Sequence, residues 1–159
     1  MGVADILRTH AHGWAYETAR QVRTTFGLRD VLSDDDIDRV LDGLGVDCDE
    51  RDLPGQLTEM YADGLIVIQR GLARVQRRWA IAHAIGHHLG HDGDQTDLEQ
   101  SWRWRQERQA DIFAGFLLIS SVVVQRSRSV YDLADQAIVP VDQAVRWCGW
   151  LVTTPWGIG

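Results

Sequence analysis

The sequence predicts an α+β domain, with helices on both sides of a short stretch of strands. Apolar residues recur every three or four positions before residue 45 and again after residue 71, which is the period of an amphipathic helix. Between these regions, two short β-like runs at 57–61 and 65–68 flank Ala62-Asp63-Gly64. The Asp-Gly pair favours a tight hairpin, so we expect two or three antiparallel strands there.

Length and composition limit the possible classes of protein. A chain of 159 residues can bury one core, and no apolar run is long enough to span a bilayer. The first residues lack the features of a secretory signal, so we expect a cytoplasmic protein. The net charge of -7 makes general attraction to nucleic acid or to an anionic membrane unfavourable, and a protein or peptide partner fits better. The two cysteines, Cys48 and Cys148, form no Cys-x-x-Cys motif and are expected to be reduced thiols.

Two helices are predicted before the strands. The first covers residues 6–26, and Gly27 is placed to end it. The second begins after Ser33, a good N-cap followed by an acidic first turn, and is closed by Gly45. Both carry an apolar stripe, so we expect them to pack on the core.

The helical period returns after Gly71 and continues until the region 90–93 breaks it. A further helix is predicted from about residue 105 to 120, with its apolar residues turned inward. The segment 130–147 reads as two short helices that meet at a turn before Pro140. We therefore expect a small helical tail after the main core.

The first of these later helices carries a candidate metal site. His83 and His87 are four residues apart, so a helix presents both imidazoles on one face to a single ion. Such a pair is weak evidence alone, but four of the six histidines lie between His83 and His91. Gly86 adds to the signal because it lets a neighbouring helix approach closely. Metal binding is therefore favoured over a structural role for these histidines.

A catalytic zinc site has three protein ligands, so a third must come from elsewhere. We choose Glu107, at the start of the next helix, with Asp111 one turn later to orient a ligand histidine. The metzincin pattern would need a histidine at position 93, which is a glycine. Less favoured ligands remain in the acidic loop that follows the motif helix: His91, Asp92, Asp94, Asp97 and Glu99.

These two segments together resemble the ImmA/IrrE family of zinc metallopeptidases. The family's motif helix reads Arg-x-x-x-Ala-His-Glu-x-Gly-His, and its second segment reads Glu-x-x-Ala-(Asn/Asp)-x-Phe-Ala followed by Leu-Leu. The resemblance extends over residues 33–120. The matching positions are Arg78, Ala82, His83, Gly86 and His87 in the first segment, and Glu107, Ala110, Asp111, Phe113, Ala114, Leu117 and Leu118 in the second.

The resemblance implies a minimal zincin-like fold, in which a small antiparallel sheet packs on the motif helix. It implies a core of residues 1–120 and a degenerate helix-turn-helix-like tail of residues 121–159. It also implies zinc as cofactor, held by His83, His87 and Glu107, with Asp111 behind them. Known relatives cut specific cytoplasmic proteins, often helix-turn-helix repressors, which implies a regulatory protease here. Direct DNA binding by the tail is not expected, because Arg146 is the only basic residue in 130–147.

The chain departs from the family at Ala84, where relatives have the catalytic glutamate. A general base contributes roughly two to four powers of ten in rate, so we expect an inactive or nearly inactive protein. The alanine fits a substitution introduced to stop cleavage, and it equally fits a natural pseudopeptidase that binds a protein partner. Other residues proposed for the site are Tyr61, Arg70 and His91 for the oxyanion, and Trp102 and Trp104 for a substrate groove.

Overall fold

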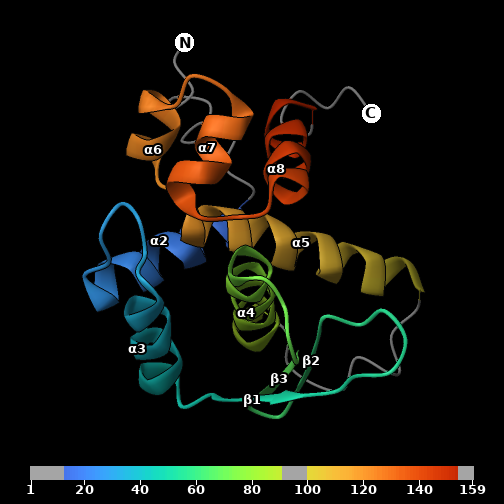
Figure 1. The fold of residues 1–159 in the computed structure, drawn as a ribbon. Helices are drawn as coiled ribbons and strands as arrows, with labels where there is room; N and C mark the ends of the chain where they lie inside the picture. Colours follow the sequence, from blue (N-terminus) through green and yellow to red (C-terminus); the bar gives the residue numbers. More distant parts are fainter. Residues whose placement is uncertain (1–12, 91–99, 154–159) are drawn as a thin grey trace.

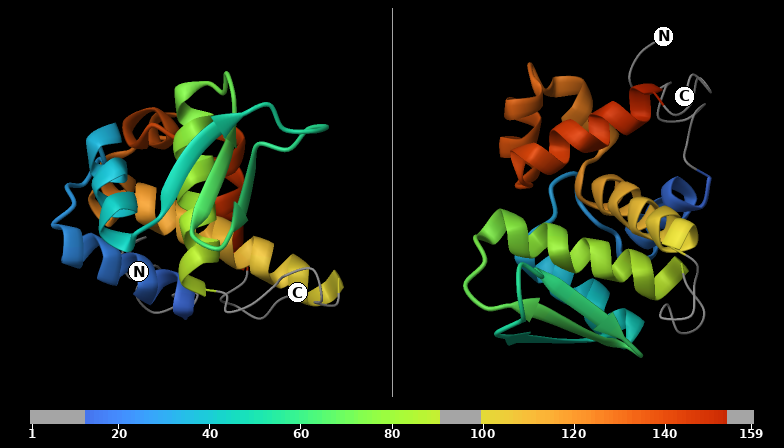
Figure 2. Two further views of the ribbon diagram at one scale, coloured as in Figure 1. Left: turned by 90° about the horizontal axis from the view of Figure 1, so that it is seen from below. Right: turned by 90° about the vertical axis from the view of Figure 1, so that its right-hand side faces the viewer.

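The computed structural model describes residues 13–90 and 100–153, which form seven helices and one three-stranded sheet. The α+β prediction is confirmed. The helix α4 (Arg74–Gly90) lies in the middle of the molecule, with the sheet against one side and α5 (Gln100–Leu118) against the other (Figures 1 and 2). None of the described helices is long and apolar enough to cross a membrane.

The two helices before the sheet end where the sequence predicts. In α2 (Trp14–Phe26), the C-cap Gly27 has the left-handed conformation, with φ 59°. In α3 (Asp34–Leu44), Ser33 accepts a hydrogen bond from the Asp36 backbone N–H, and the Asp36 carboxylate accepts one from the Ser33 N–H. This capping box satisfies two backbone donors at the start of α3. The predicted residues 6–12 of the first helix lie outside the described part of the chain.

The sheet has the order β1-β3-β2, with β1 (Asp47–Arg51), β2 (Glu59–Ala62) and β3 (Leu65–Gln69). The hairpin between β2 and β3 is antiparallel, as predicted. The prediction of a wholly antiparallel sheet is wrong, because β1 pairs with β3 in parallel. β3 is the most apolar strand and buries Ile66 and Ile68 completely, so it takes the centre and leaves the polar β1 and β2 at the edges.

The helices α4 and α5 pack closely because Gly86 has no side chain. A Cβ at Gly86 would lie 3.0 Å from Phe113 Cδ1 and 3.1 Å from the Cα of Ala110, both on α5. These distances are tighter than ordinary van der Waals contact, as the sequence prediction for Gly86 requires. The contact brings the start of α5 beside the histidines of α4.

The tail contains the two predicted helices, α7 (Val130–Ala137) and α8 (Val141–Thr153), and an unpredicted one, α6 (Ser121–Arg126). Trp147 of α8 is buried and donates a hydrogen bond from Nε1 to the Ile112 carbonyl at 3.2 Å. The buried guanidinium of Arg78 donates to the Ile138 carbonyl and to Asp34, both at 2.9 Å. The tail is thus joined to the core by polar contacts, and the boundary at residue 120 stays a prediction.

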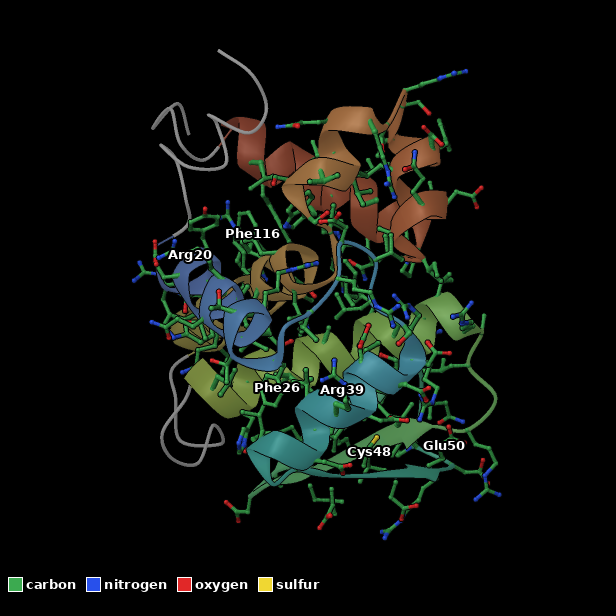
Figure 3. All side chains as sticks on the ribbon, turned by 90° about the vertical axis from the view of Figure 1, so that its left-hand side faces the viewer. Arg20, Phe26, Arg39, Cys48, Glu50 and Phe116 are labelled. Atoms are coloured by element: carbon green, nitrogen blue, oxygen red, sulfur yellow. The ribbon has the colours of Figure 1, made fainter. Side chains whose placement is uncertain are left out.

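Both cysteines are free thiols and half-buried, as expected. Cys48 belongs to β1, and its side chain is on the side of the sheet that faces α3 (Figure 3). Burial raises the pKa of both thiols, so they have little thiolate at neutral pH.

Candidate metal centre

Three side chains from two helices converge beside the sheet. The Nε2 atoms of His83 and His87, both on α4, lie 3.0 Å apart. One carboxylate oxygen of Glu107, on α5, lies 3.0 Å from His83 Nε2, and the other lies 3.0 Å from His87 Nε2. In the described residues these three form the one group of possible ligands whose donor atoms all lie within 4.8 Å of each other.

The local sequence explains this convergence. Residues four apart share a helix face, which puts the imidazoles of His83 and His87 on the same side of α4. Glu107 comes from the first half of α5, where α5 passes over α4. The close approach at Gly86 is therefore what brings the carboxylate within reach of both rings.

Asp111 lies one turn after Glu107 and holds the first histidine from behind. Its Oδ1 lies 2.6 Å from His83 Nδ1 and also accepts a hydrogen bond from Trp79 Nε1 at 3.3 Å. With Nδ1 directed at Asp111, the Nε2 atom of His83 is the ring nitrogen that faces His87 and Glu107. A carboxylate in this position fixes the tautomer of a ligand histidine and raises its basicity.

The charges in the cluster are strongly coupled. Burial lowers the pKa of His83, but hydrogen bonds to Asp111 and Glu107 outweigh burial and raise this pKa to about 10. Burial raises the pKa of Glu107, but its hydrogen bonds to His83 and His87 outweigh that and lower it well below its usual range. The Asp111 and Glu107 carboxylates therefore favour a positive charge at His83, which a divalent cation bound at Nε2 can supply in place of a proton.

These donors fit zinc. Two imidazole nitrogens and one carboxylate form a known three-ligand set for a catalytic zinc ion, which keeps a fourth position open. Bonds of ~2.0–2.1 Å in a tetrahedral arrangement separate the ligand atoms by about 3.3 Å. The observed separations of 3.0 Å are close to that value. Small side-chain movements are therefore enough to admit the ion.

Two cavities flank the cluster. The larger, about 690 Å³, is lined by Ala84, Leu57, Met60 and Tyr61 beside the three candidate ligands. The smaller, about 300 Å³, lies between α4 and the start of α8. Ala84 thus lies at the cavity wall, and its methyl group is buried and carries no proton acceptor.

Sequence reasoning missed Glu59, which lines both cavities from β2. Its Oε1 lies 3.6 Å from His83 Nε2, and its side chain is 19% exposed. A signal was available, because side chains two apart on a strand share a face and Tyr61 was already a candidate. Tyr61 also lines the larger cavity, and its hydroxyl lies 2.6 Å from His88 Nδ1.

The remaining predicted site residues are less well placed. Arg70 is exposed after the end of β3 and lines neither cavity. Trp104 is 69% exposed and borders a third cavity, of about 370 Å³, beside Glu107 and Asp111. Several candidates lie outside the described residues: His91, Asp92, Asp94, Asp97, Glu99 and the side chain of Trp102.

Comparison with known proteins agrees with the fold. No curated protein matches the sequence significantly. A transcriptional regulator of Mycobacterium tuberculosis has a similar structure, with a TM-score of 0.65 at 18% identity over 88% of this chain. The chain spans 48% of that protein, so the similarity concerns the fold of one part of it. The model of the IrrE N-terminal-like domain matches residues 42–143, and the chain therefore belongs to this family, the M78 peptidases.

Proposed function

We propose that His83, His87 and Glu107 form the zinc site of a regulatory peptidase that acts on a specific cytoplasmic protein. The observation that carries this proposal is the convergence of two imidazole nitrogens and a carboxylate within 4.8 Å, with Asp111 behind the first ring. A zinc ion held there polarises water and the substrate carbonyl. The larger cavity leaves room for a peptide beside it.

Membership of the M78 family supports a protein substrate, and a helix-turn-helix repressor is the class that the family resemblance favours. The similar structure from Mycobacterium tuberculosis, a transcriptional regulator, is consistent with a regulatory setting. The net charge of -7 disfavours direct DNA binding by this chain.

Alanine at position 84 sets the expected activity. Because a positioned base contributes roughly two to four powers of ten in rate, cleavage that depends on a carboxylate at this position should be nearly abolished. The fold should tolerate the alanine well, since Ala84 is buried inside α4 and alanine is the best helix former. We therefore expect a folded, metal-binding protein with very low turnover.

A second candidate function follows from the same residue. If the alanine is natural, the chain is a pseudopeptidase that uses its metal-stabilised cavity to bind a protein without cutting it. The retention of both histidines, Glu107 and Asp111 is compatible with this role too, because the metal would stabilise the fold.

The first experiment is zinc analysis of the full chain, with a His83→Ala/His87→Ala variant as control. One zinc per chain that is lost in the control supports the site, and absence of zinc binding contradicts both candidate functions. The second compares cleavage of a candidate repressor by the chain and by Ala84→Glu. Cleavage gained with glutamate favours the peptidase, whereas binding without cleavage in both proteins favours the pseudopeptidase.

A further inference from the structure

The larger cavity contains a second carboxylate that the ligand set does not use. Among its lining residues the acidic side chains are Glu107, a candidate ligand, and Glu59. Glu59 belongs to β2, an edge strand of the sheet, and not to the motif helix. The cavity that lacks a carboxylate at Ala84 therefore receives one from a different element.

The structure holds the Glu59 carboxylate in place. Its Oε2 accepts a hydrogen bond from the Thr58 hydroxyl, while its Oε1 faces His83 Nε2 at 3.6 Å. Only 19% of the side chain is exposed, so the carboxylate is mostly within the cavity wall. One oxygen is thus directed at the metal-binding nitrogen of His83.

The distances make Glu59 a neighbour of the ion and not a ligand. It does not join the group of donor atoms that all lie within 4.8 Å of each other, so it is farther than that from His87 or from Glu107. A carboxylate outside that group would not bind directly an ion held by the three candidate ligands, but one small molecule could bridge the two.

We propose that Glu59 accepts the hydrogen bond of whatever molecule occupies the open coordination position of the metal, in place of the carboxylate missing at position 84. The proposal rests on the zinc site of the proposed function. Glu59 would supply the hydrogen-bond acceptor that Ala84 lacks. Any remaining turnover would then depend on this residue of the edge strand β2. Two other polar groups near the cluster already have partners, since Tyr61 contacts His88 and Asp111 contacts His83.

The test uses the zinc-loaded full chain and acetohydroxamic acid, which binds zinc through two oxygens and needs an acceptor for its proton. Glu59→Gln keeps the shape of the side chain and removes the charged acceptor. Because a hydrogen bond to a charged group is worth a factor of roughly 10 to 100, the affinity for acetohydroxamate should fall at least about fivefold. The zinc affinity should fall by less than about a hundredfold relative to the parent chain, since no metal bond is lost. Calorimetry measures both affinities.

Glu50→Gln is the matched control, because it makes the same charge change on β1 (Figure 3), where Glu50 pairs with Arg77 at 3.0 Å. It should leave acetohydroxamate binding unchanged. Adding Ala84→Glu to the Glu59→Gln variant should restore the lost affinity, because either carboxylate can then serve as acceptor. Circular dichroism confirms that each variant is folded.

The possible failures are distinguishable. If the parent chain binds no zinc, the proposed function fails and this inference fails with it. If zinc binds but Glu59→Gln leaves acetohydroxamate affinity unchanged, only the role of Glu59 is wrong. A loss of zinc affinity greater than about a hundredfold in Glu59→Gln also overturns the role, because a loss beyond the range for residues that only support ligands makes Glu59 a direct ligand.

Discussion

Replacing Asp111 by asparagine should weaken zinc binding without removing a ligand. In the structure Asp111 Oδ1 lies 2.6 Å from His83 Nδ1, a short distance for a hydrogen bond between a nitrogen and an oxygen. Asparagine keeps the size of the side chain and one acceptor but loses the negative charge. His83 then becomes a weaker ligand whose tautomer is less firmly fixed.

The expected magnitude follows from the position of Asp111 behind the ligand. Losing such a partner costs about 10- to 100-fold in metal affinity, which is about 1.4–2.7 kcal/mol. The Trp79 Nε1–H also donates to Asp111 Oδ1, and asparagine can still accept that bond, so the fold should change little. Competition with a chromophoric zinc chelator at neutral pH measures the affinity.

Asp135→Asn provides the control, since Asp135 is exposed on α7 and the substitution removes the same charge. It should leave zinc affinity within twofold of the parent chain. If Asp111→Asn also binds zinc within twofold, Asp111 does not support the ligand histidine and the reasoning is refuted.

Three further variants test the stability of the fold: one at a close helix contact, one at a buried guanidinium and one at a helix cap. Gly86→Ala should destabilise the protein by about 1 kcal/mol in urea, because crowding against Phe113 outweighs the gain in helix propensity, whereas Gly149→Ala, with nothing within 4 Å of the added Cβ, should not destabilise it. Arg78→Met should lower the free energy of unfolding by about 2–4 kcal/mol, because the carbonyls of Ile138 and Ala137 lose the hydrogen bonds that Arg78 donates. The variant should still bind one zinc per chain. Asp36→Asn should cost about 1 kcal/mol at pH 7. Hydrogen bonds from Arg39 and Ser33 hold the Asp36 pKa below its usual value, so this difference should begin to shrink as the pH falls below about 4. It should vanish only when the pH is below the lowered pKa of the folded state, where both proteins unfold alike in urea.

Much of the fold could be predicted because its boundaries depend on local chemistry. Ser33 and Gly45 limit α3 through a capping box and a left-handed residue, and both are visible in the sequence. The Asp63-Gly64 turn likewise predicts the β2–β3 hairpin, and both residues have positive φ. The strand order could not be predicted in the same way, because it depends on which strand gains most from lying at the centre of the sheet, between two neighbouring strands.

The candidate site likewise has parts that local sequence predicts and parts that depend on how distant segments pack. The pairing of His83 with His87 follows from helical spacing, and the approach of Glu107 follows from a family pattern that preserves a helix contact. Glu59 was missed because its one local signal is its place two residues before Tyr61 on the same strand face, and no pattern connects that strand with residues 83–87. Its position depends on β2 being an edge strand next to α4, which follows from the strand order.

The candidate metal site is therefore a property of the folded chain and not of the motif helix alone. His83 and His87 would be near each other in any helix, but Glu107 reaches them only when α5 packs at Gly86. Because zinc would bind the assembled site and not the separated helices, its binding free energy would add to the stability of the fold, by about 2.7 kcal/mol when free zinc is 100 times the dissociation constant. That coupling would hold whether or not Ala84 permits cleavage, so zinc would stabilise the packing of α4 against α5 even in a chain without turnover.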